Sequence, residues 1–416
     1  MAEREELDAF TSDPAVLGWM QGFPAAADKR LAWARADHMR FPMHRYAFSR
    51  MREFVPTARV GRGQGPVWEL PEAWRDDLDA VSFTAMGGGA EMSWKDALAA
   101  NFTDAVCVLH KGALVYERYL GLTRRDTPHI AWSVTKSFVG TLMEMLIHEG
   151  RIDPKAPVAA LIPEMAASGF ADATVGQVMD MTTGLAFSEE YSDSNSGIGA
   201  MSNALGLTPR TPGYQGPDSV FGFLPTIGKA GEHGERFMYR TCNTEVLGWL
   251  IARTEGKRLQ EVLSERIWQP LGMEQDADFL IDGSGMAFAG GGLNPVLRDM
   301  ARFGEAMRCD GVGNGRQVIP VAVVESVRRG AKPEDFARST YPHLPGWSYR
   351  SQWWITHNNR GAFTARGIHG QAIYVDPAAE MVVARFASHP IAANSAIDPA
   401  SLPAYEALAE HLIRAG

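Results

Sequence analysis

Apolar residues recur at the spacing of one helical face between positions 134 and 150. The pattern predicts a helix that ends at His148-Glu149-Gly150, because the glycine supplies a C-terminal stop. Further helices are predicted over Thr174 to Met181, with Thr174 as the N-cap, and over Thr244 to Thr254, with Asn243 as the N-cap. Weaker helical patterns cover residues 31–39, 259–268, 296–307 and 401–414.

Apolar and β-branched runs predict strands in two regions that lie far apart in the chain. Residues 104–109 and 113–119 flank a turn at His110-Lys111-Gly112 and indicate a hairpin. Four more runs, at 349–356, 361–366, 371–375 and 381–388, are joined by short turns. The economical fold is α+β, in which both regions build one antiparallel sheet that is flanked by helices and carries an inserted all-helical lobe.

We expect three parts in this fold. Residues 1–103 show little periodicity and form an N-terminal extension that wraps the core. An α/β lobe with the antiparallel sheet combines residues 104–165 and 340–416. A mainly helical lobe spans residues 166–339.

Composition limits the kinds of partner. The 416 residues are 45% hydrophobic and 21% charged, and the net charge of −9 opposes binding to nucleic acid or to an anionic membrane. Residues 1–20 are acidic and lack the apolar core of a secretory signal, so we expect a cytoplasmic protein. The expected partner is a small-molecule substrate, and a homodimer stays open as an alternative.

Metal and cofactor motifs are lacking in the sequence. Cys107, Cys242 and Cys309 are too widely spaced for a disulfide framework or a zinc site. The eleven histidines lack the spacing of a metalloprotease helix. We therefore expect no metal and no cofactor.

Ser133 and Lys136 open the best-defined helix and are the leading candidates for chemistry. Residues three apart in a helix share a face, so a hydroxyl and an amine meet where the backbone N–H groups of a helix N-terminus favour negative charge. The alternative interpretation is an ordinary N-cap serine and a solvated lysine. Tyr239 is the best second proton carrier, and the sequence has no Gly-x-Ser-x-Gly elbow.

Several further motifs occur in a characteristic order along the chain after Ser133 and Lys136. They are Thr182-Thr183-Gly184-Leu185, Phe237-x-Tyr239, Pro270-Leu271-Gly272-Met273, Gly291-Gly292-Leu293, Arg298 to Phe303 and Gly370 to Asp376-Pro377. In this order the sequence resembles the serine β-lactamase and penicillin-binding-protein superfamily, in its class C and esterase branch. It is most similar there to the 6-aminohexanoate-dimer (nylon-oligomer) hydrolases and related carboxylesterases, through Tyr191 after two glutamates, Tyr239 to Asn243, and Gly367 to Gln371.

The resemblance implies a role for each matching residue. Ser133 would be the nucleophile, with Lys136 and Tyr239 as proton carriers. The backbone N–H groups of Ser133 and Ile368 would form the oxyanion hole. Tyr191 would contact the scissile amide, and Trp354 would lie near the substrate.

Two positions depart from the superfamily pattern. Thr241 stands where the Tyr-x-Asn triplet has asparagine, and Ala365-Arg366-Gly367 stands where Lys-Thr-Gly or His-x-Gly is expected. The favoured hypothesis is therefore a serine hydrolase of small linear amides such as 6-aminohexanoate oligomers. A carboxylesterase for short acyl esters is the alternative. Less favoured are a β-lactamase or D-alanyl-D-alanine carboxypeptidase and a catalytically silent binding protein.

Overall fold

A seven-stranded antiparallel sheet forms the centre of the structure, a computed structural model that describes residues 7–191 and 193–415. The strand order is β10-β11-β12-β13-β14-β4-β5, and every neighbouring pair is antiparallel. The strands are β4 (Thr103–His110), β5 (Ala113–Tyr119), β10 (Ser348–Arg350), β11 (Trp353–Ile355), β12 (Phe363–Gly367), β13 (Gln371–Asp376) and β14 (Met381–Ala387). The predicted sheet from two distant regions is thus confirmed.

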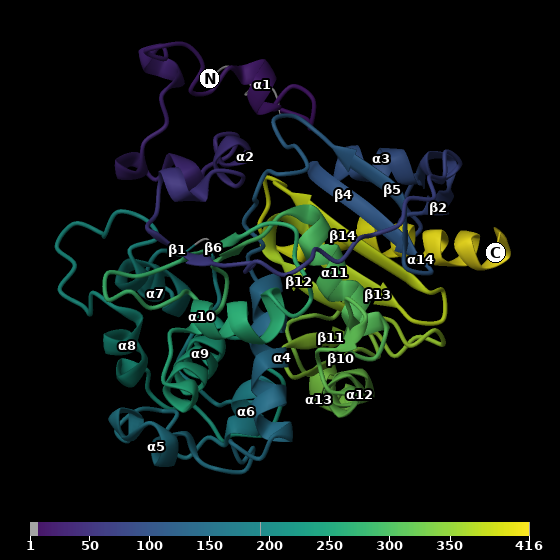
Figure 1. Cartoon of the computed structure of the whole chain (residues 1–416). Helices are drawn as coiled ribbons and strands as arrows, with labels where there is room; N and C mark the ends of the chain where they lie inside the picture. The colour runs from purple at the N-terminus through teal and green to yellow at the C-terminus, as the bar shows by residue number, and fades with distance from the viewer. Residues whose placement is uncertain (1–6, 192, 416) are drawn as a thin grey trace.

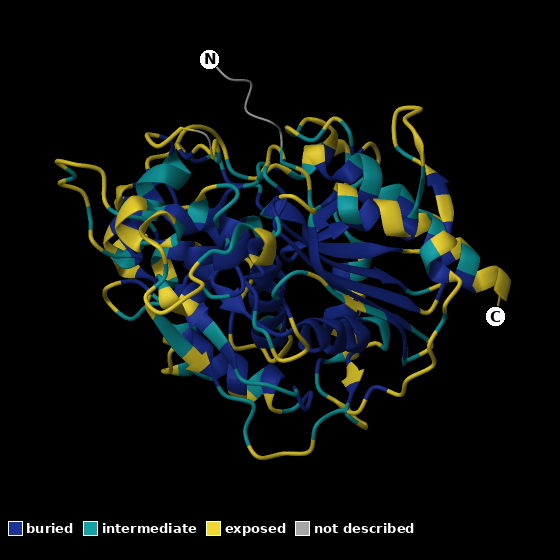
Figure 2. Ribbon diagram, turned by 90° about the horizontal axis from the view of Figure 1, so that it is seen from above, coloured by how far each residue is buried: buried dark blue, intermediate teal, exposed yellow. Residues whose placement is uncertain are grey.

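Helices cover both faces of this sheet (Figure 1). On one face, α14 (Asp398–Ala415) and α3 (Trp94–Ala100) pack over β4, β5, β13 and β14. On the other face, α4 (Val134–His148) and α11 (Leu297–Arg308) share the main apolar core with the sheet. Figure 2 shows the strands of the sheet as a continuous buried layer.

Other helices lie mostly on the far side of α4 from the sheet (Figure 1). They are α5 (Val158–Leu161), α6 (Val175–Met179), α7 (Gly197–Leu205), α8 (Val220–Phe223), α9 (Thr241–Glu255) and α10 (Leu259–Leu263). Two more, α12 (Val321–Arg329) and α13 (Pro333–Ala337), lead back to the sheet. None of the helices in the described ranges is both long and apolar enough to cross a bilayer.

Two helix boundaries that the sequence predicts are confirmed by the structure. Thr174 caps α6, and a reciprocal pair of bonds with Gln177 completes a capping box. The glycine stop of α4 is also confirmed, because Gly150 has a positive φ of 70° that favours glycine.

Three local predictions were wrong. The strand predicted over 349–356 is two strands, β10 and β11, which are separated by Ser351 and Gln352, both with positive φ. Asn243 does not cap a helix, because α9 already begins at Thr241. The helix predicted over 31–39 is a pair of single 3-10 turns at Trp33–Arg35 and Asp37–Met39.

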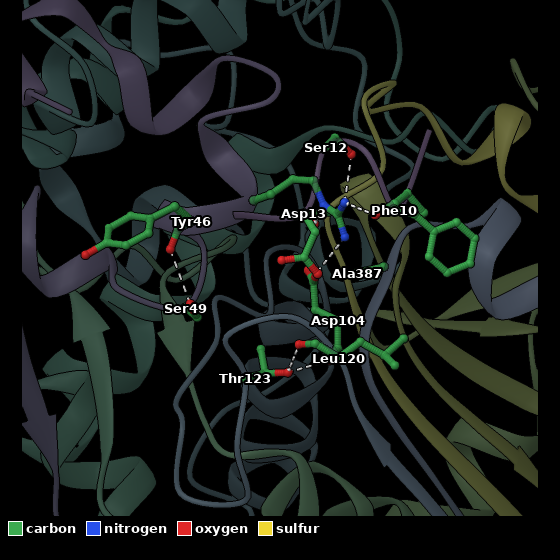
Figure 3. A network of polar contacts seen from close by, with 12 residues as sticks. Phe10, Ser12, Asp13, Tyr46, Ser49, Asp104, Leu120, Thr123 and Ala387 are labelled. Atoms are coloured by element: carbon green, nitrogen blue, oxygen red, sulfur yellow. Dashed lines mark hydrogen bonds and ion pairs between the residues drawn. The ribbon is translucent and has the colours of Figure 1, made fainter. Parts of the chain in front are cut away.

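A buried arginine helps to fasten the N-terminal segment to the sheet. Arg45, in α2 (His44–Ala47), donates from Nη1 to Ser12 Oγ at 2.7 Å, and its Nη2 lies 3.4 Å from Asp104 Oδ1. Asp104 belongs to β4, and its backbone carbonyl accepts a hydrogen bond from the Thr123 hydroxyl. Figure 3 shows Ser12, Asp104 and Thr123 gathered at this point. The segment also adds β1 (Thr57–Val60), which pairs with β6 (Ala277–Leu280), and the hairpin of β2 (Ser82–Thr84) and β3 (Glu91–Ser93).

Candidate active site

Ser133 occupies the N-cap position of α4, but its side chain makes no capping hydrogen bond. The residue before it, Trp132, has a positive φ of 44°, a conformation that is strained for a bulky side chain and is typical of functional sites. The alternative interpretation of Ser133 as an ordinary N-cap therefore does not describe this geometry. The hydroxyl is left available for another partner.

Lys136 is that partner. Its Nζ donates to Ser133 Oγ at 3.0 Å and to the carbonyl of Gly290 at 2.5 Å. The side chain is 1% exposed, so the alternative of a solvated lysine is also excluded. Burial lowers the pKa of Lys136, while the nearby Glu189 and Glu245 carboxylates oppose the shift. A lysine with a lowered pKa can lose its proton near neutral pH and accept the proton of a neighbouring hydroxyl.

Glu245 is a site residue that the sequence reasoning missed. Its carboxylate accepts hydrogen bonds from the N–H groups of Ala289 and Gly290, at 3.1 and 2.7 Å. Burial raises its pKa, and the bond from Gly290 and the charge of Lys136 oppose the shift. Gly290 has to be glycine here, because a Cβ would lie 2.4 Å from Thr241 Cγ2. The signal that could have identified Glu245 is a charged side chain within 242–247, a buried part of helix α9.

Tyr239 lies beside both groups. Lys136 Nζ is 5.2 Å from the centre of the Tyr239 ring, and the phenol interacts with the Ser133 hydroxyl. Burial raises the pKa of Tyr239 well above its ordinary value, although the Ser133 interaction lowers it. The phenol therefore stays protonated at neutral pH and is suited to donate a proton rather than to remove one.

Trp354 supports Tyr239 from the sheet. The two rings stack with centroids 5.5 Å apart, and Trp354 is only 4% exposed. It belongs to an aromatic cluster, with Phe237, Phe336 and Tyr349, that holds the Tyr239 ring in one orientation.

Ile368 opens a short 3-10 turn, Ile368–Gly370, directly after β12. The first N–H groups of such a turn have no intrahelical acceptor. Gly367 lies against the segment that leads into Ser133, because a Cβ on it would be 2.7 Å from the carbonyl of Ala131. Gly367 and the segment that leads into α4 thus share one corner of the structure, and the amide of the next residue, Ile368, stays a prediction as the second oxyanion donor.

A model of the Beta-lactamase family matches residues 96–401, most of the chain. The chain belongs to the beta-lactamase family. A curated relative, the 6-aminohexanoate-dimer hydrolase of Paenarthrobacter ureafaciens, is 35% identical over 86% of this chain and 88% of its own length. These matches confirm the family and fold that the motif order predicts.

Solved beta-lactamase-family structures give the same result. A Bacillus anthracis protein named "Putative 6-aminohexanoate-dimer hydrolase" superposes with a TM-score of 0.83 at 32% identity, covering 91% of this chain and 96% of its own. A family VIII carboxylesterase shares the fold, with a TM-score of 0.56 at 18% identity over 76% of this chain and 96% of its own.

Glu189 explains the departure at Thr241 in this beta-lactamase-family chain. Its carboxylate accepts from the Thr241 hydroxyl and, at 3.0 Å, from the Thr241 N–H, so a loop residue caps α9. The same carboxylate accepts from the Tyr191 hydroxyl at 2.8 Å. Tyr191 is 42% exposed, yet this bond turns its hydroxyl toward Glu189 and the site. Within the described ranges, no group of three His, Cys, Asp or Glu side chains is placed to hold a metal ion.

Proposed function

We propose that this protein is a serine hydrolase that cleaves small linear amides, such as 6-aminohexanoate oligomers, through an acyl-enzyme on Ser133. One observation carries the proposal: the buried amine of Lys136 lies 3.0 Å from the Ser133 hydroxyl, next to Tyr239. The 35% identity to a 6-aminohexanoate-dimer hydrolase supports the choice of substrate class.

Acylation begins at the Ser133–Lys136 hydrogen bond. Neutral Lys136 accepts the hydroxyl proton while Ser133 Oγ attacks the substrate carbonyl. The backbone N–H groups of Ser133 and Ile368 bind the resulting oxyanion, and each contributes on the order of 3 kcal/mol to transition-state stabilisation. We assign Lys136 rather than Tyr239 as the base, because burial lowers the pKa of the lysine and raises that of the phenol.

Tyr239 then protonates the leaving amine as the C–N bond breaks, and Lys136 returns its proton to Tyr239. This relay moves one proton from Ser133 to the leaving group and restores both carriers. In deacylation, water replaces the amine and the same steps run in reverse. The stacking of Tyr239 on Trp354 keeps the phenol fixed in position through both halves of the reaction.

Tyr191 is proposed to favour amides over esters. Its hydroxyl is anchored on Glu189 and lies close enough to Tyr239 for the two phenols to affect each other electrostatically. A hydroxyl at that point can contact the nitrogen of a scissile amide as it becomes tetrahedral. An ester oxygen carries no hydrogen and gains less from such a contact.

Matched amide and ester substrates with the same acyl group test the proposal. We expect 6-aminohexanoate dimer to be hydrolysed, and we expect Tyr191→Phe to lower kcat/KM on the amide at least about tenfold while the ester value changes little. Tyr214→Phe is the matched control, because that phenol instead donates to the carbonyl of Pro217. If the wild-type protein cleaves the ester and leaves the amide intact, the alternative of a carboxylesterase for short acyl esters replaces the first proposal.

A further inference from the structure

A small cavity lies between the sheet and α14, behind the strand that leads to Ile368. Its volume is about 10 Å³, which is room for one water-sized particle. Arg366, Arg385, Asp398, Ser401 and Tyr405 line it. These residues come from β12, β14 and α14 and are all buried.

The lining carries more positive than negative charge. Arg366 forms an ion pair with Asp398. Arg385 donates to the carbonyl of Gly370 at 2.9 Å and to Ser401 Oγ at 3.1 Å, and in the described part of the chain it has no carboxylate within 4.0 Å. Asp398 is also shared with His343, at 2.9 Å. Two buried guanidinium groups therefore face a single carboxylate, which is costly unless another negative charge is present.

Two hydrogen-bond donors of the lining residues are unused. Among the described residues, Nη1 of Arg366 and the hydroxyl of Tyr405 are buried without a hydrogen-bond partner. The Arg385 guanidinium lies over the Tyr405 ring, 5.5 Å from its centre, and Arg366 lines the same cavity. An occupant that satisfies this lining accepts hydrogen bonds, carries negative charge and is about the size of one atom.

We propose that this cavity binds a single monovalent anion of the halide class, with chloride as the occupant in ordinary buffers. The anion accepts from Arg366 Nη1 and Tyr405 and balances the second guanidinium. Water is the competing occupant, but it supplies no charge. The proposal is independent of the substrate class proposed above.

The anion would act on the oxyanion corner through the two arginines. Arg366 immediately precedes Gly367 and Ile368, and its guanidinium stacks 5.0 Å from the Trp354 ring. Arg385 holds the carbonyl of Gly370 at the other end of the same turn. Arg366 and Arg385 tie both ends of the turn to α14 through Asp398 and Ser401, and the anion balances their excess positive charge, so we expect halide to stabilise the fold.

Thermal unfolding of the full-length protein in sodium chloride and in sodium gluconate of equal ionic strength tests the proposal, because gluconate is too large for the cavity. We expect Tm to rise by at least about 2 °C in 0.2 M chloride and to saturate with concentration. Tyr405→Phe removes one donor and should raise the chloride concentration at half-effect about tenfold. Tyr374→Phe is the control, since that phenol is equally buried and outside the lining.

Crystals grown with sodium bromide provide the direct measurement. An anomalous peak between Arg366 and Tyr405, together with the solution effect, supports the proposal. Equal Tm values in chloride and gluconate overturn it, whether the cavity then holds water or holds bromide at crystal concentration only. A chloride effect that Tyr405→Phe leaves unchanged also overturns it, because the anion then acts elsewhere.

Discussion

Gly367→Ala should damage catalysis while leaving the fold intact. Gly367 has φ −131° and ψ 153°, an extended conformation that alanine adopts without strain, so the effect of the methyl group is purely steric. A Cβ at this position would lie 2.7 Å from the carbonyl oxygen of Ala131 and 3.0 Å from Gln371 Cβ. Ordinary contact begins at 3.4 Å, so β12 must move away from Ala131 by about 0.7 Å.

A shift of this size separates Ile368 from Ser133. Oxyanion donors work at about 2.7–3.1 Å, and the loss of one donor costs about 2.7–4 kcal/mol, or roughly 100- to 1,000-fold in kcat. We expect that loss in kcat for a chromogenic ester, with KM changed much less, because the donor acts mainly in the transition state. Circular dichroism and thermal unfolding establish that the variant is folded.

Gly65→Ala is the matched control, since a Cβ there has open space and the residue lacks a positive φ. It should retain wild-type kcat. A folded Gly367→Ala variant that keeps kcat within about threefold of wild type would show that Ile368 does not supply an oxyanion donor.

Three further predictions concern charge and packing. Glu189 raises the pKa of Lys136, so Glu189→Gln should move the acidic limb of the kcat/KM profile to lower pH. Burial lowers the pKa of His369 to about 4. The neutral imidazole therefore contributes on the order of 3 kcal/mol of stability above pH 6.5, and this contribution is lost as the pH falls toward 4. Urea unfolding of His369→Asn should show a shallower dependence of stability on pH. Gly140→Ala puts a Cβ 2.2 Å from the carbonyl of Ser351 and should lower the unfolding free energy by about 1–3 kcal/mol.

Each of the three variants has one outcome that would contradict the prediction made for it. An acidic limb that moves to higher pH in Glu189→Gln would mean that the carboxylate does not act on Lys136. An unchanged pH slope in His369→Asn would assign the acid sensitivity to other groups. If Gly140→Ala has the same unfolding free energy as the wild type, the turn between β10 and β11 can move away from α4 at little cost.

Periodic patterns in the sequence were sufficient to predict the sheet and the helix that carries Ser133. Each of those elements has its signal in neighbouring residues, such as the apolar face of α4 or the Gly112 turn between β4 and β5. The motif order also predicted that Ser133, Lys136 and Tyr239 act together, although Tyr239 lies in the irregular segment before α9, far from α4 in the sequence.

The missed features depend on partners that are distant in the sequence. Helix α9 starts at Thr241 because the carboxylate of Glu189, 52 residues earlier, accepts its N–H. The strand predicted over 349–356 breaks because Asp180 accepts the N–H of Ser351 at 2.9 Å and Gln352 donates to the carbonyl of Met179 at 2.7 Å. Neither Ser351 nor Gln352 is a typical residue for positive φ, so no local pattern indicates the turn.

Mass spectrometry of the acyl-enzyme tests the central claim most directly. The protein is incubated with a fluorophosphonate, digested and mapped, in parallel with Lys136→Ala and Ser133→Ala. We predict one adduct, on the peptide that contains Ser133, with labelling at least about 100-fold slower in Lys136→Ala and absent in Ser133→Ala. An adduct on another residue, or hydrolytic activity that survives in Ser133→Ala, would contradict the account.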